Sequence, residues 1–125
     1  MTRGDTLILA CESDPIESAR LSRALMLLGY SPETATSADE VIELIRSRMY
    51  QRAIVAIEMT LQGEPVLTRL VRLPSTKAVL AVGPAGDPEM ETLARLSGAA
   101  AYLPRPVTIE SLSKALWTPA SGKFA

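Results

Sequence analysis

Three charged side chains each follow an apolar segment of this chain, and they are the residues best placed to do chemistry. Glu12 follows the segment 6–11, Glu58 closes the segment 53–57, and Arg105 comes shortly after the last apolar segment. Two carboxylates can act as acids or bind a hard cation, and a guanidinium grips carboxylates and phosphates. Glu58 draws attention first, because a lone acid at the end of a buried strand is where a functional carboxylate would be placed.

Alternating strands and helices must position these residues. Short β-branched runs predict buried strands, and apolar residues at three- and four-residue steps predict helices. Strands are predicted at 6–11, 31–36, 53–57, 77–82 and 99–103. Helices are predicted at 15–28 and 64–73 and in the segments that follow Ser37, Asp87 and Thr108. Asp14-Pro15 and Asp87-Pro88 are favourable helix starts, and Ser37 with Glu40 has the spacing of a capping box.

Five strands alternating with five helices predict an α/β fold, a doubly wound (βα)5 sandwich with a parallel sheet and helices on both faces. With 125 residues and 47% hydrophobic content, the chain suits one domain. We expect that domain to span residues 1–117, with residues 118–125 as a C-terminal tail or linker stub.

The carboxyl ends of parallel strands share one edge of the sheet, so Glu12, Glu58 and Arg105 are expected to meet in a shallow pocket. Simpler interpretations also apply. Glu12 alone is more often a solvated loop residue, and Arg105 between two prolines could be a plain surface charge. Asp14 is most simply a helix cap, and Cys11 a small core residue.

Composition narrows the function classes. Histidine is absent, which removes the commonest general base and metal ligand. A net charge of −1, with no basic run, argues against direct binding of nucleic acid. No apolar stretch approaches a membrane span, and the single cysteine fits a reducing cytoplasm. These observations exclude most hydrolases and zinc sites. We expect a cytoplasmic protein that makes no membrane contact and is not an enzyme.

Several motifs resemble the receiver domains of two-component response regulators, the CheY-like family. The segment 7–15 is similar to the family's opening, Leu25-x-x-x-Gly29-Tyr30 to the end of its first helix, and 98–107 to its Gly-Ala-x-x-Tyr-Leu-x-Lys-Pro signature. The resemblance covers about residues 6–117. It implies a five-stranded parallel sheet of order 2-1-3-4-5 and a role in phosphorelay signalling.

The acidic positions depart from the family pattern. The resemblance implies a phospho-accepting aspartate at the position of Glu58, and an acidic pair that holds Mg²⁺ at the positions of Glu12 and Ser13. Ser13 lacks the carboxylate that should face the metal. Glu12 and Glu58 are each one methylene longer than aspartate, so they stay only weak metal candidates.

The switch positions depart as well. The resemblance implies a threonine or serine where this chain has Gly83, and a lysine where it has Arg105. Tyr102 keeps the aromatic residue that the pattern asks for. Arg105 suits a bidentate grip on a carboxylate, so Glu58 and Arg105 are expected to form an ion pair across the pocket.

These substitutions favour a pseudo-receiver that works without phosphorylation and without a cofactor, as a module that binds other signalling proteins. Its partners would be a histidine kinase, an output domain or protein, or a second copy of the chain. The resemblance implies a contact face made of the fourth helix, the fifth strand and the fifth helix. It offers Met90, Leu93, Tyr102 and Trp117, and Trp117 could equally be a core residue.

Two alternatives remain open. The chain could be an atypical receiver that is still phosphorylated with Mg²⁺. It could also be a flavodoxin-like binder of a flavin or nucleotide, although no glycine-rich phosphate motif is present.

Overall fold

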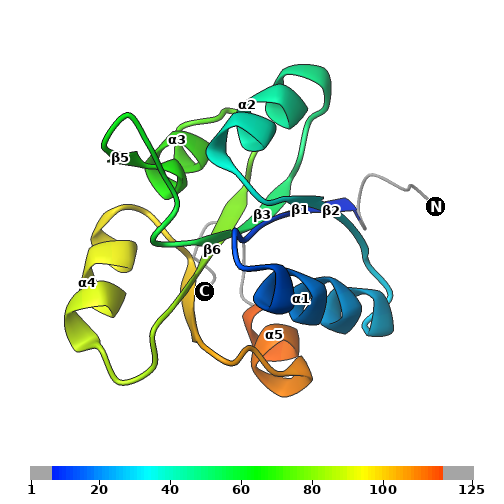
Figure 1. Ribbon diagram of the computed structural model, residues 1–125, viewed down its shortest axis with the longest axis vertical. Coiled ribbons are helices and arrows are strands. Elements are labelled where there is room, and N and C mark those ends of the chain that lie inside the picture. Colours follow the sequence, from blue (N-terminus) through cyan, green and yellow to red (C-terminus); the bar gives the residue numbers. More distant parts are fainter. Residues whose placement is uncertain (1–6, 117–125) are drawn as a thin grey trace.

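The chain forms a three-layer α/β sandwich, and the computed structural model describes residues 7–116 (Figure 1). The central sheet comprises five parallel strands in the order β2-β1-β3-β6-β7. They are β1 (Leu7–Cys11), β2 (Ser31–Ala35), β3 (Arg52–Ala56), β6 (Ala78–Gly83) and β7 (Ala101–Pro104). The predicted order 2-1-3-4-5 is confirmed once the two short strands β4 and β5, which form a separate hairpin, are set aside.

Helices cover both faces of this sheet, as the alternating pattern predicted (Figure 1). Helices α1 and α5 lie side by side on one face, and α2, α3 and α4 cover the other. They are α1 (Pro15–Leu27), α2 (Ala38–Ser47), α3 (Val66–Val71), α4 (Pro88–Leu96) and α5 (Ile109–Leu116).

The period-two alternation of the strands divides the core into two clusters. In β1, Leu9 and Cys11 face the side of α2, α3 and α4, whereas Ile8 and Ala10 face α1 and α5. All four residues are at most 1% exposed, so β1 is buried on both faces. Burial raises the pKa of the Cys11 thiol far above its usual value, and Cys11 is therefore the small core residue that the sequence indicated.

Helix starts follow the local cap signals. The Asp14 carboxylate accepts hydrogen bonds from the backbone N–H groups at the start of α1, and Asp87 does the same for α4. Ser37 Oγ accepts from the backbone N–H of Glu40, as predicted. The Glu40 carboxylate instead accepts from the N–H and hydroxyl of Thr36, so the reciprocal half of the capping box is displaced by one residue.

The predicted helix over 64–73 was wrong at both ends. Its first residues form a small antiparallel hairpin, β4 (Thr60–Leu61) with β5 (Glu64–Pro65), and α3 spans only Val66–Val71. Gln62 and Gly63 make the turn with φ values of 54° and 83°, in the left-handed region. The backbone N–H of Val66 then donates to the carbonyl of Met59, which closes the loop that follows β3.

Both outer strands of the sheet carry a proline, Pro32 in β2 and Pro104 in β7. In β2, Glu33 forms an ion pair with Arg48 and accepts a hydrogen bond from the Tyr50 hydroxyl. Among residues 7–116, no helix has the length and apolar character needed to cross a membrane.

Candidate functional site

The charged residues singled out in the sequence meet at the carboxyl edge of the sheet. Glu12 directly follows β1, Glu58 lies two residues beyond β3, and Arg105 directly follows β7. The backbone N–H of Arg105 also donates to the carbonyl of Gly83 at the end of β6, with an N–O distance of 2.9 Å. The three side chains therefore come from three different strand ends, which is the convergence that a parallel sheet predicts.

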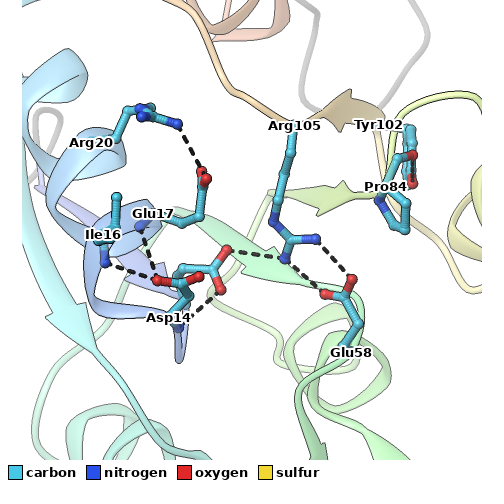
Figure 2. Close-up of polar contacts among 9 residues, drawn as sticks. Asp14, Ile16, Glu17, Arg20, Glu58, Pro84, Tyr102 and Arg105 are labelled. Atoms are coloured by element: carbon cyan, nitrogen blue, oxygen red, sulfur yellow. Dashed lines mark hydrogen bonds and ion pairs between the residues drawn. The ribbon is translucent and has the colours of Figure 1, made fainter.

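Arg105 contacts both carboxylates. Its Nη1 and Nη2 donate to Glu58 Oε2 and Oε1, each at 2.8 Å, in a parallel two-point contact (Figure 2). Nη2 also donates to Glu12 Oε1 at 3.1 Å. The expected ion pair between Glu58 and Arg105 is confirmed, and the guanidinium additionally bridges to Glu12. One cation thus holds two acids together at the edge of the sheet.

The two carboxylates differ strongly in exposure. The Glu58 side chain is 45% exposed, whereas that of Glu12 is 5% exposed. Glu12 is therefore not a solvated loop residue, because Arg105 covers it and β1 places it against the core. It also accepts a hydrogen bond at 3.3 Å from the N–H of Asp14. A charge this buried needs a partner, and Arg105 supplies one.

The electrostatics of the pocket favour the ionised forms of Glu58 and Arg105. Hydrogen bonds from Arg105 lower the pKa of the Glu58 carboxyl, although partial burial opposes the effect. The same contacts, first with Glu58 and then with Glu12, raise the pKa of Arg105 beyond its already high value. Both shifts favour the charged pair, so the contact persists throughout the physiological pH range.

The other predicted positions lie around this pair. Ser13 and Asp14 are exposed, and Asp14 caps α1. Gly83 is buried at the end of β6. Tyr102 is half-buried, and its hydroxyl donates to the Pro84 carbonyl at 2.8 Å (Figure 2). Burial and the nearby charge of Asp87 raise the pKa of Tyr102.

The apolar residues of the predicted contact face differ in their exposure to solvent. Met90 is half-buried and packs against the core, whereas Leu93 is 47% exposed. Leu96, one turn along α4 from Leu93, is 81% exposed. The three-residue spacing of Leu93 and Leu96 was the signal that could have added Leu96 to this face. Trp117 lies outside the described residues.

Mg²⁺, the cation that the resemblance implies, does not fit the observed arrangement. Magnesium requires several oxygen ligands in near-octahedral geometry. Here Glu12 and Glu58 are both engaged by Arg105, and the neighbouring Ser13 offers only a neutral hydroxyl. Across residues 7–116 no group of three or more acidic or cysteine side chains is arranged to hold a metal ion.

Comparison with solved structures identifies the fold. Neither a protein-family model nor a curated protein matches the chain by sequence. The structure is similar to a receiver domain from Clostridium thermocellum, with a TM-score of 0.76 and 26% identity over 89% of this chain and 90% of the other. It is also similar to the signal receiver domain of an HD domain-containing protein from Pseudomonas fluorescens, with a TM-score of 0.75 and 26% identity over 88% and 90% of the two chains.

A chemotaxis response regulator of Vibrio cholerae has the same fold, with a TM-score of 0.74 and 22% identity over 89% of this chain and 95% of the other. The chain therefore has the doubly wound fold of CheY-like receiver domains. The neighbours support the receiver domain of a response regulator as its class of protein, and such domains are generally signalling modules.

Proposed function

We propose that this chain is a pseudo-receiver, a receiver domain that takes no phosphoryl group at Glu58 and acts through protein contacts alone. The observation that supports the proposal most strongly is the contact of Arg105 with both Glu58 and Glu12. A side chain that accepts a phosphoryl group must present a free oxygen to the donor, with a cation nearby to neutralise the developing charge. Here both Glu58 oxygens already accept hydrogen bonds, and the cation belongs to the protein itself.

The geometry of the ion pair favours a permanent contact. Two parallel hydrogen bonds fix the relative orientation of guanidinium and carboxylate, and the prolines on either side of Arg105 restrict its backbone. A partly exposed pair of this kind contributes only about 0–1 kcal/mol to stability. Its role in the proposal is therefore to hold the shape of the pocket.

The proposed partners are other signalling proteins, such as a histidine kinase, an output domain or a second copy of the chain. They would contact the α4–β7–α5 face, defined by helix α4, strand β7 and helix α5. Exposed Leu93 and Leu96 support this choice, because apolar side chains on an outer helix face are suited to a protein contact. The proposal includes no cofactor, no enzymatic activity and no direct contact with nucleic acid.

Phosphoryl transfer tests this proposal directly. The protein is incubated with acetyl phosphate and Mg²⁺, and intact mass is measured over time beside a conventional receiver domain that confirms the activity of the reagent. We expect no phosphoryl adduct on this chain. A stable adduct that is lost in Glu58→Gln would overturn the proposal.

One observation favours a second candidate, an atypical receiver that is still phosphorylated. Glu58 is 45% exposed, so a phosphoryl donor could reach it if Arg105 moved aside. Titration with Mg²⁺ separates the two candidates. Millimolar or tighter binding that is lost in Glu12→Ala supports the phosphorylated receiver, whereas the pseudo-receiver requires no such binding.

A further inference from the structure

The side chain of Tyr102 fills the space that any side chain at position 83 would occupy. A Cβ atom built on Gly83 would lie 2.3 Å from Tyr102 Oη and 2.9 Å from both Cε1 and Cζ. Real Cβ contacts essentially never fall below 3.0 Å. The observed position of the tyrosine ring and a side chain at position 83 are therefore mutually exclusive.

Further contacts hold the ring over Gly83. The Tyr102 hydroxyl donates to the Pro84 carbonyl, and the ring packs against the core cluster on the α2–α4 side of the sheet. If the ring swung out to solvent, the space over Gly83 would be left without packing and the Pro84 carbonyl would lose its protein donor. No side chain at position 83 competes for the space, so the observed position is favoured.

The loop that begins at Gly83, at the end of β6, also holds the backbone of Arg105 in the ion-pair site. The carbonyl of Gly83 accepts from the N–H of Arg105, and the next carbonyl, that of Pro84, accepts from Tyr102. Two consecutive residues at the end of β6 thus hold the tyrosine and the backbone of the arginine. A displacement of this loop would disturb both.

The position of Tyr102 shapes the surface on both sides of β7. Its ring lines a hollow of about 400 Å³ next to α4, together with Gly86, Asp87, Pro88, Glu91 and Pro104. It also lines a hollow of about 310 Å³ next to α5, together with Leu103, Pro104, Ser111, Lys114 and Ala115. Because one side chain borders both hollows, its rotation would change the contour of the whole α4–β7–α5 face.

We propose that Gly83 is a positioning residue that keeps Tyr102 seated over the end of β6 and so holds the α4–β7–α5 face in a single conformation. The inference rests on the proposed function, because it describes how a domain that receives no phosphoryl signal keeps a fixed contact surface. A two-state surface would need a second arrangement of comparable free energy. Because Gly83 has no side chain, the observed position of Tyr102 is favoured. Nothing at position 83 can push the ring into a second position.

Fluorine NMR on the protein labelled with 3-fluorotyrosine tests the inference. The chain has three tyrosines, Tyr30, Tyr50 and Tyr102, and single substitutions to phenylalanine assign their resonances. We expect one sharp resonance for Tyr102, displaced from the position of a fully exposed fluorotyrosine. In Gly83→Ala it should move toward the position of an exposed fluorotyrosine, whereas Ala85→Ser, an exposed change in the same loop, should leave it in place. Two exchanging Tyr102 resonances in the unsubstituted protein, or no shift in Gly83→Ala, would overturn the inference.

A double-substitution cycle keeps the test decisive if Gly83→Ala folds poorly. The added methyl should raise the unfolded-to-folded ratio about tenfold or more, as overpacking does. In the Tyr102→Ala background the same change should be neutral or favourable, because the space is then open. An equal penalty in both backgrounds would show that the tyrosine is not what excludes a side chain at position 83.

The outcomes are separable from those of the phosphoryl-transfer test, since the spectra are recorded without any phosphoryl donor. A phosphoryl adduct on Glu58 together with a single Tyr102 resonance would refute the pseudo-receiver but not the fixed position of Tyr102 over Gly83. A mobile Tyr102 without any adduct would refute only the fixed position of Tyr102.

Discussion

Removing the guanidinium of Arg105 should destabilise the fold mainly through Glu12, the buried acid, and less through Glu58. In Arg105→Ala, the Glu58 carboxylate loses two hydrogen bonds but remains 45% exposed and can be hydrated, which costs about 0–1 kcal/mol. Glu12, with a side chain 5% exposed, loses its only charged donor among the described residues and keeps one weak contact at 3.3 Å. Leaving a buried charged acceptor without its hydrogen-bond donor lowers the free energy of unfolding by about 1.5–3 kcal/mol.

The combined loss in Arg105→Ala is therefore about 1.5–4 kcal/mol, and its upper end reaches the range of about 3–5 kcal/mol lost when a fully buried ion pair is broken. Urea unfolding followed by circular dichroism measures it. With a slope of about 2 kcal/mol per molar urea, the midpoint should fall by about 0.8–2 M. Glu58→Gln should lower the free energy of unfolding by no more than about 1 kcal/mol.

The matched control places Arg105→Ala in a Glu12→Gln background. The glutamine amide keeps the shape of Glu12 but is uncharged, so removal of Arg105 leaves no buried charge without a partner. The cost of Arg105→Ala should therefore fall to about 1 kcal/mol or less. If Arg105→Ala costs the same in both backgrounds, or no more than Glu58→Gln, the argument that Glu12 depends on this cation is wrong.

Three further outcomes follow from particular contacts. Arg105 lowers the pKa of Glu58 below its usual 4.5, so the stabilisation is present above that value and lost as pH falls through the lower folded pKa. The difference in free energy of unfolding between the unsubstituted protein and Glu58→Gln should accordingly shrink between pH 7 and about pH 3 in acid-dependent urea titrations. Asp14→Ala should cost about 1 kcal/mol by loss of the cap at Ile16 N–H, and Asp14→Asn much less, as measured by thermal unfolding. Tyr50→Phe should cost about 1 kcal/mol, because the buried hydroxyl donates to Glu33, and an unchanged melting temperature would contradict that role.

The parts of the fold that the sequence predicted correctly depend on local or strictly periodic signals. The caps at Asp14 and Asp87 act within three residues, and the buried strands repeat every second residue. The pair between Glu58 and Arg105 was also predictable, although 47 positions separate them, because parallel strands deliver their ends to one edge.

The errors arose where distant or unusual backbone contacts decide the structure. Glu12 is buried by Arg105, which lies 93 positions further along the chain. No residue near Glu12 in the sequence indicates this contact. The helix predicted from residue 64 begins only at Val66, because Gln62 and Gly63 take left-handed conformations and pair 64–65 with 60–61 in a hairpin. The seat of Tyr102 over Gly83 likewise depends on the spacing between two neighbouring strands, β6 and β7.

The proline in the outer strand β2 has a consequence for self-association. An unprotected sheet edge is a template for another strand, and such pairing leads to aggregation. Proline has no N–H to donate, so Pro32 interrupts the row of donors along the free edge of β2. Glu33 of β2 and its ion-pair partner Arg48 add charge where a second sheet would have to approach. Copies of this chain are therefore expected to resist stacking through the β2 edge, so a dimer should form through another surface.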